Sequence, residues 1–268
     1  MFPFLLPLRR FQRKLFFYTK MRFDGNTYAK TLAAEEFPFQ AYRTDSLLIN
    51  EHSGHDIKYQ YNKVFNLKLA SAQINRMVIQ PGETFSFYQA IKNADKKQPF
   101  KDGLNLVDGK IVGSYAGGLC QLSSMLYWMF LHTPLTITER HGHGIESFPT
   151  TTEDLPLGTD ATVSEGWLDL KATNNTKNPW QIVITFDNDF MYGAMHCDKP
   201  ADIEYEIFNS DIIYFRKGGK IYQKSTVNRR ERDLNTQSIT NYKLYDNVCE
   251  IGYELPETCI ITEQPMGV

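Results

Sequence analysis

One cysteine of this chain occupies a position where the backbone can activate a thiol. Cys120 follows Gly117 and Gly118 and opens an apolar stretch that predicts a helix over residues 120–131. The N–H groups and the positive dipole end at a helix start favour a thiolate over a thiol. The two glycines permit tight backbone geometry and leave room for a substrate at the sulfur. The pattern therefore indicates nucleophilic chemistry at Cys120.

Two histidines and an aspartate follow the cysteine in the order that thiol catalysis uses. His141 closes an alternating segment that predicts a strand over residues 135–141, His143 stands two residues further on, and Asp160 follows a loop. In this order, which papain-like and transglutaminase-like nucleophiles share, an imidazole takes the thiol proton and a third group orients the ring. Both histidines point to one face of an extended chain. The base is therefore His141 or His143. The orienting group is Asp160, and Asp169 is a weaker candidate.

The same residues allow other interpretations, which stay open at this point. A free cysteine is often a small buried hydrophobe, and two glycines before a helix are often only a turn. His141 and His143 with Cys120 also supply the nitrogen and sulfur ligands that zinc accepts. We rank zinc below the thiol hypothesis, so we expect no metal and no other cofactor. Gln121, beside the backbone N–H of Cys120, is either an oxyanion donor or a polar residue of the first helical turn.

The motifs that hold these residues resemble the VanW family, the accessory proteins of vancomycin B-type resistance clusters and their relatives. The resemblance extends over most of the chain and is carried by PGETFSF (81–87), GGLCQLSS (117–124), ERHGH (139–143) and GTDATV (158–163). It departs at Ala116, where many relatives have a third glycine. It favours His143 as the base, because a glycine-flanked second histidine looks like the family's recurrent one. The candidate substrate-binding residues are then Gly117, Gly118, Gln121 and His141.

The resemblance implies an association with glycopeptide (vancomycin) resistance and the cell wall. The first hypothesis is a Cys–His thiol acyltransferase or amidase-like enzyme, with Cys120, His143 and Asp160 as catalytic residues and a peptide-like or cell-wall precursor as substrate. The second is a non-catalytic binding or accessory protein of a resistance or cell-envelope pathway. Alkylation separates the two, because an inert core cysteine stays unmodified in the native protein. The sequence specifies neither the substrate nor the oligomeric state.

Charge, cysteine count and hydropathy argue against several classes of protein. The 268 residues carry a formal net charge of −2, which gives no reason to expect a nucleic-acid partner. The four cysteines show no zinc spacing and no C-x-x-C pair. No run approaches the ~20 apolar residues of a spanning helix. Residues 2–8 are broken by prolines and followed by charge, unlike a signal peptide. We therefore expect a cytoplasmic protein without a membrane anchor.

The amino-terminal segment predicts a basic amphipathic helix over residues 8–18. Residues 1–22 contain six basic and no acidic side chains. Four apolar side chains share one face of the helix, namely Leu8, Phe11, Leu15 and Tyr18. Such a helix either makes peripheral contact with an anionic membrane or docks its apolar stripe on the acidic remainder of the protein. We favour docking.

The order of predicted elements indicates an α+β fold, with amino-terminal helices followed by a mainly antiparallel sheet. Helical spacing predicts a second helix from an Asn62 N-cap through Val78, and residues 92–110 are expected to form a loop. Later segments predict hairpins around residues 187–189 and 217–219. The expected organisation is an amphipathic and irregular segment (1–60) and a VanW-like domain (61–268), with a motif core (81–176) and a β-rich carboxy-terminal part (177–268).

Overall fold

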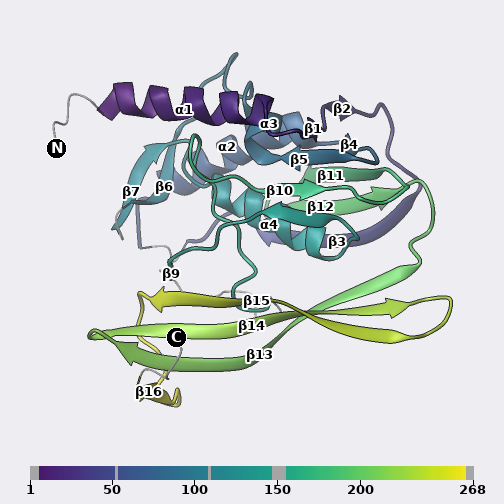
Figure 1. The fold of residues 1–268 in the computed structure, drawn as a ribbon. Helices are drawn as coiled ribbons and strands as arrows, with labels where there is room; N and C mark the ends of the chain where they lie inside the picture. The colour runs from purple at the N-terminus through teal and green to yellow at the C-terminus, as the bar shows by residue number, and fades with distance from the viewer. Residues whose placement is uncertain (1–5, 52–53, 108–109, 147–154, 264–268) are drawn as a thin grey trace. The chain divides into compact units, whose positions relative to one another are not determined.

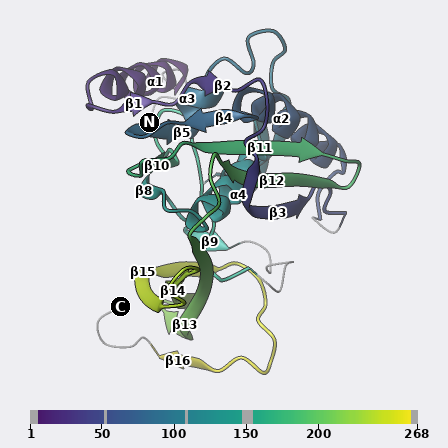
Figure 2. The ribbon, with the colours of Figure 1, turned by 90° about the vertical axis from the view of Figure 1, so that its right-hand side faces the viewer.

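The computed structural model describes residues 6–51, 54–107, 110–146 and 155–263. The chain divides into two compact units (Figures 1 and 2). The first unit is Met1–His141 with Ala161–Pro200, and the second is Gly142–Asp160 with Ala201–Val268. This division differs from the boundary at residue 60 that the sequence suggests. The segment that carries His143 and Asp160 instead leaves the first unit and belongs to the second.

The first unit holds four helices and three sheets among its described residues. The helices are α1 (Leu6–Arg22), α2 (Lys58–Ile74), α3 (Phe87–Ile91) and α4 (Leu119–Leu131). One sheet has the order β1-β5-β10-β8, made by β1 (Thr27–Tyr28), β5 (Glu83–Ser86), β10 (Lys171–Thr173) and β8 (Thr136–Glu139). The second has the order β2-β4-β11-β12-β3, made by β2 (Thr31–Leu32), β4 (Met77–Ile79), β11 (Trp180–Phe186), β12 (Phe190–Cys197) and β3 (Phe39–Leu47). The third is a hairpin of β6 (Asp102–Val107) and β7 (Lys110–Tyr115).

Helix α4 forms the centre of this unit's core because it is apolar on nearly every side. Ten of its 13 residues are buried, and it packs on β3, β12 and α2 (Figure 1). Gly193 of β12 allows the close approach, since a Cβ there would lie 2.6 Å from the sulfur of Met129. Phe130 contacts Phe85 of β5 edge to face, with ring centroids 5.2 Å apart. Packing against both large sheets therefore fixes the helix that carries Cys120.

The described residues of the second unit form one sheet of order β16-β13-β14-β15-β9. Its long antiparallel strands are β13 (Ile203–Lys217), β14 (Lys220–Asp233) and β15 (Ile239–Ile251), and the short strands β16 (Ile261–Glu263) and β9 (Ile145–Glu146) join in parallel. The β13–β14 turn uses Gly218 and Gly219 at φ 58° and 78°, as a tight two-residue hairpin turn requires. Strand β9 ties the segment after Gly142 to β15, because the Glu250 N–H donates to the Gly144 carbonyl oxygen.

The predicted α+β class is confirmed, and most strand pairs are antiparallel. The predicted cysteine helix is α4, and the two predicted hairpins are β11–β12 and β13–β14. The second helix was predicted at the wrong limits. It begins at Lys58, so Asn62 lies inside it. It ends at Ile74 because Arg76 takes a φ of 63° and donates its N–H to Ile182 of β11, which places Val78 in β4.

The predicted loop 92–110 was also wrong in part, because residues 102–107 form β6 and pair with β7. Helix α1 is present, but the predicted docking of its apolar stripe is wrong for three of four residues. Leu8, Phe11 and Leu15 are exposed, whereas Tyr18 is half-buried and hydrogen-bonds to Tyr88 and Glu165. None of the described helices has both the length and the hydropathy needed to cross a membrane.

Candidate functional site

The cysteine-bearing end of α4 begins with a turn that requires glycine. The helix starts at Leu119, one residue before Cys120, and its N-cap Gly118 has φ 90° and ψ −3°. Residues with a Cβ rarely adopt this left-handed conformation. Gly117 meets Gly103 of β6 closely, since a Cβ on Gly117 would lie 2.1 Å from the Gly103 carbonyl carbon. Backbone geometry therefore requires both glycines, and their predicted role in substrate binding stays a prediction.

Two residues of α2 hold this turn, and sequence reasoning missed them. The buried Asn66 donates to the carbonyl oxygens of Lys101 (2.8 Å) and Gly117 (3.0 Å) and accepts the Lys101 N–H (2.8 Å). Lys63 runs along the turn, since a Cβ on Gly118 would lie 2.2 Å from its Cγ. Burial lowers the pKa of Lys63 to about 8. No motif marks them, although their i, i+3 spacing places both on one face of α2.

The first turn of α4 binds the segment that follows Asp160 in the chain. Ser123 Oγ donates to the Ala161 carbonyl oxygen at 2.6 Å, and Ser124 Oγ accepts the Ala161 N–H at 3.1 Å. These bonds bring the Val163 carbonyl oxygen to 3.9 Å from the half-buried sulfur of Cys120. Two of the motifs recognised in the sequence are therefore in contact. In the sequence, the serines that join them cannot be told apart from ordinary residues of a first helical turn.

Gln121 faces β3. Its Nε2 donates to Ser46 Oγ at 2.8 Å and to the Leu47 carbonyl oxygen at 2.7 Å. Its backbone N–H donates to the Gly118 carbonyl oxygen at 3.1 Å. An amide side chain has two N–H groups, so the donors of Gln121 are all used within the protein. The substrate-binding role of Gln121 and the oxyanion role of the Cys120 backbone N–H therefore stay predictions.

Tyr88 of α3 is a further candidate that no motif signalled. Its side chain is buried, and its pKa is raised well above the ordinary value. Burial is the largest cause, followed by electrostatic interactions with Cys120, Glu165 and Asp169. The phenol of Tyr88 therefore stays protonated and can serve as a hydrogen-bond donor in the surroundings of Cys120.

His143 and Asp160 form a close pair within the second unit. Asp160 Oδ2 lies 2.5 Å from His143 Nδ1 and accepts the His143 backbone N–H at 2.7 Å. A carboxylate held in this way orients the imidazole and stabilises its protonated form. The structure thus brings together two of the three predicted catalytic residues. Cys120 belongs to the first unit, and its pairing with His143 stays a prediction.

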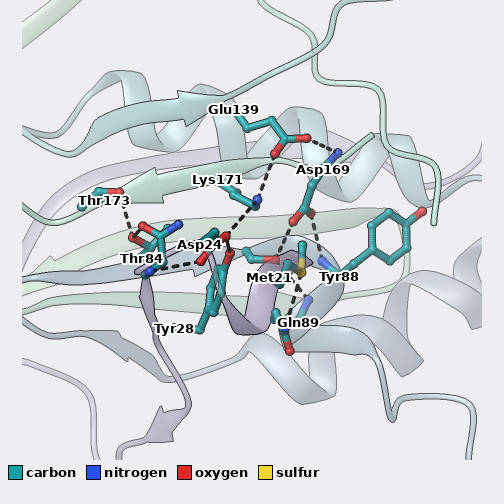
Figure 3. A network of polar contacts seen from close by, with 12 residues as sticks. Met21, Asp24, Tyr28, Thr84, Tyr88, Gln89, Glu139, Asp169, Lys171 and Thr173 are labelled. Atoms are coloured by element: carbon teal, nitrogen blue, oxygen red, sulfur yellow. Dashed lines mark hydrogen bonds and ion pairs between the residues drawn. The ribbon is translucent and has the colours of Figure 1, made fainter. Parts of the chain in front are cut away.

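His141 pairs with a different acid. Its Nε2 lies 3.1 Å from Glu139 Oε1, and Glu139 also binds Lys171 at 3.0 Å and accepts the Asp169 N–H at 3.0 Å (Figure 3). Lys171 in turn lies 4.0 Å from Asp24. His141 is therefore attached to a charged network that connects β8 with β10, and its predicted contact with substrate stays a prediction.

The same network contains a buried acid, Asp169. Its carboxylate accepts Ser86 Oγ at 2.5 Å and the Tyr88 N–H at 3.1 Å (Figure 3). Burial raises its pKa to about 6 despite these hydrogen bonds. Asp169, considered from the sequence as a weaker orienting group, is thus occupied with β5 and α3. No group of three or more His, Cys, Asp or Glu side chains in the described residues is arranged to hold a metal ion.

Comparison with known proteins identifies the class of this chain. The family model described as VanW like protein matches residues 62–196, which contain α4, Cys120, His143 and Asp160. The chain belongs to this family. It is 47% identical, over 263 residues, to the vancomycin B-type resistance protein VanW of Enterococcus faecalis (strain ATCC 700802 / V583), covering 98% of this chain and 96% of that protein.

A second relative matches a smaller part of the chain. The uncharacterized protein YoaR of Bacillus subtilis (strain 168) is 33% identical over 114 residues, which is 42% of this chain and 36% of that protein. No solved structure gives a significant match.

Proposed function

We propose that this chain acts in vancomycin resistance through a reactive thiol at Cys120. The observation that supports the proposed chemistry is the position of Cys120 in the first turn of α4, two residues after the N-cap Gly118. The N–H groups and the dipole of a helix start stabilise a thiolate. The relative named as a vancomycin B-type resistance protein, which spans nearly the whole chain, supports the biological part.

In the proposed reaction the Cys120 thiolate attacks the carbonyl carbon of a peptide-like or cell-wall precursor. His143, oriented by Asp160, accepts the thiol proton and returns it to the leaving amine as the tetrahedral intermediate collapses to a thioester. The Cys120 N–H stabilises the oxyanion. Water then releases the acid, or an acceptor amine takes the acyl group.

The first test measures how fast each cysteine of the native protein reacts with iodoacetamide near neutral pH. Burial raises the pKa of Cys197, and burial with the acids Glu146 and Asp160 raises that of Cys249 to about 12. Cys120 is therefore expected to react first. His143→Ala should slow the reaction of Cys120. The matched control His141→Ala should leave it unchanged, because His141 is bound to Glu139.

The second test measures the vancomycin susceptibility of cells in which resistance depends on this protein. Cys120→Ala and Cys120→Ser should both abolish its contribution while the purified variants remain folded. Full activity of either variant, or equal labelling of Cys120 and Cys259, would refute the hypothesis that Cys120 is a nucleophile. The non-catalytic accessory function would then be the correct assignment.

A further inference from the structure

Among the described residues, the polar contacts that attach helix α1 to the first unit lie towards its carboxy-terminal end, where α3 is its neighbour in Figure 1. Met21 is 3% exposed and its sulfur accepts Gln89 Nε2 at 3.3 Å. The hydroxyl of Tyr18 donates to Glu165 at 2.8 Å, and Lys14 pairs with the same carboxylate at 2.8 Å. Of the four residues of the predicted apolar stripe, only Tyr18 takes part in these contacts.

The other three residues of the apolar stripe face solvent. Leu8, Phe11 and Leu15 are 53%, 63% and 58% exposed. Their spacing of three and four residues places them in one row along the helix. Phe16, on another side of the helix, is also exposed. Single exposed apolar residues are common on protein surfaces, but a continuous row on one helix usually marks an interaction site.

The same helix carries exposed positive charge and contacts an exposed tryptophan. Of the six basic residues in the segment, Arg9, Arg10, Lys20 and Arg22 point into solvent. The guanidinium of Arg13 stacks on Trp167, at 3.8 Å from the ring centroid, and Trp167 is itself 62% exposed. Tryptophan and arginine with this exposure are typical of surfaces that meet lipid headgroups.

We propose that α1 attaches the protein to an anionic membrane surface, lying in the plane of the headgroups with Leu8, Phe11 and Leu15 inserted. The charge of the helix argues for this partner. An anionic bilayer provides an apolar layer for the row and negative headgroups for the four exposed cations. A second copy of this chain would place the same cations against each other.

Vesicle sedimentation with the full chain tests this proposal. The protein should sediment with phosphatidylcholine vesicles that contain phosphatidylglycerol, and release at high salt is expected because exposed charges are screened. Pure phosphatidylcholine should bind it much more weakly. Arg9→Gln with Arg10→Gln should weaken binding to anionic vesicles by roughly 30-fold, because each cation near such a surface contributes about fivefold.

The decisive variant is Leu8→Glu with Phe11→Glu, which should abolish sedimentation. Its matched control is Leu32→Glu with Phe39→Glu, which changes two comparably exposed residues of the same types on β2 and β3 and should bind normally. Both variants should unfold at the wild-type urea midpoint. Absence of wild-type binding, equal binding of the two variants, or a dimer in analytical ultracentrifugation that the Leu8 variant disrupts would overturn the proposal.

Discussion

Alanine in place of Gly118 should destabilise the first unit by about 2–5 kcal/mol. The substitution has two unfavourable contributions, one from backbone conformation and one from overpacking, and the structure separates them. A residue with a Cβ at φ 90° costs about 1–2 kcal/mol in backbone conformation. The new Cβ would also lie 2.2 Å from Lys63 Cγ and 2.9 Å from Lys63 Cδ, and overpacking of this kind costs about 1–3 kcal/mol.

Gly82 provides the control for the backbone term. It has a φ of 80°, and a Cβ there would meet nothing within 4 Å. Gly82→Ala should therefore cost only about 1–2 kcal/mol. Lys63→Ala should restore part of the stability lost by Gly118→Ala, because it removes Cγ and Cδ but leaves Cβ at 2.9 Å. The double-mutant cycle should show a favourable coupling of about 1–2 kcal/mol.

Urea unfolding followed by tryptophan fluorescence is the assay. The three tryptophans, Trp128, Trp167 and Trp180, all belong to the first unit, so the signal reports on the unit that contains the turn. The reasoning is refuted if Gly118→Ala and Gly82→Ala cost the same, or if the cycle shows no coupling. A second readout is the alkylation rate of Cys120, which should change in Gly118→Ala and not in Gly82→Ala.

Two further substitutions test the residues around the turn and the buried acid. Asn66→Ala should cost about 2–4 kcal/mol in urea unfolding, because it leaves buried partners on Lys101 and Gly117 without their hydrogen bonds; a cost below about 1 kcal/mol would contradict this role. For Asp169, a pKa raised from 3.8 to about 6 means that the folded state binds the proton more tightly, so the associated stability is present below pH 3.8 and is lost as pH rises through 6. The stability of Asp169→Asn relative to wild type should therefore increase by up to about 3 kcal/mol across that interval, and a pH-independent difference between the two proteins would refute the raised pKa.

Local patterns in the sequence were sufficient to predict several elements. The helix that starts beside Cys120 was predictable because a run of apolar residues follows a glycine turn, and α4 extends over that run. The hairpins β11–β12 and β13–β14 were predictable because each has strand-forming residues on both sides of a turn signal. The α+β class follows from the order of these elements. All of these features depend on neighbours that are close in the chain.

The functions of individual side chains around α4 were decided by tertiary contacts. Gln121 carries a side-chain amide that could donate to an oxyanion, but this amide donates to Ser46 and Leu47 of β3. Asn66 and Lys63 carry no motif, and they matter only because α2 packs against the turn at Gly118. Hydrogen-bond partners far apart in sequence leave no local periodicity, so no pattern in the chain could have assigned them.

Helix α1 shows most clearly which properties follow from the sequence and which depend on tertiary contacts. Its sequence determined that it is helical, basic and apolar along one row, because these properties depend on spacing and residue type alone. The sequence did not determine which side would dock. Tyr88, Gln89 and Glu165 supply the docking contacts, and their positions are set by the rest of the fold. They bind the side of Tyr18 and Met21, and the apolar row is left exposed to solvent.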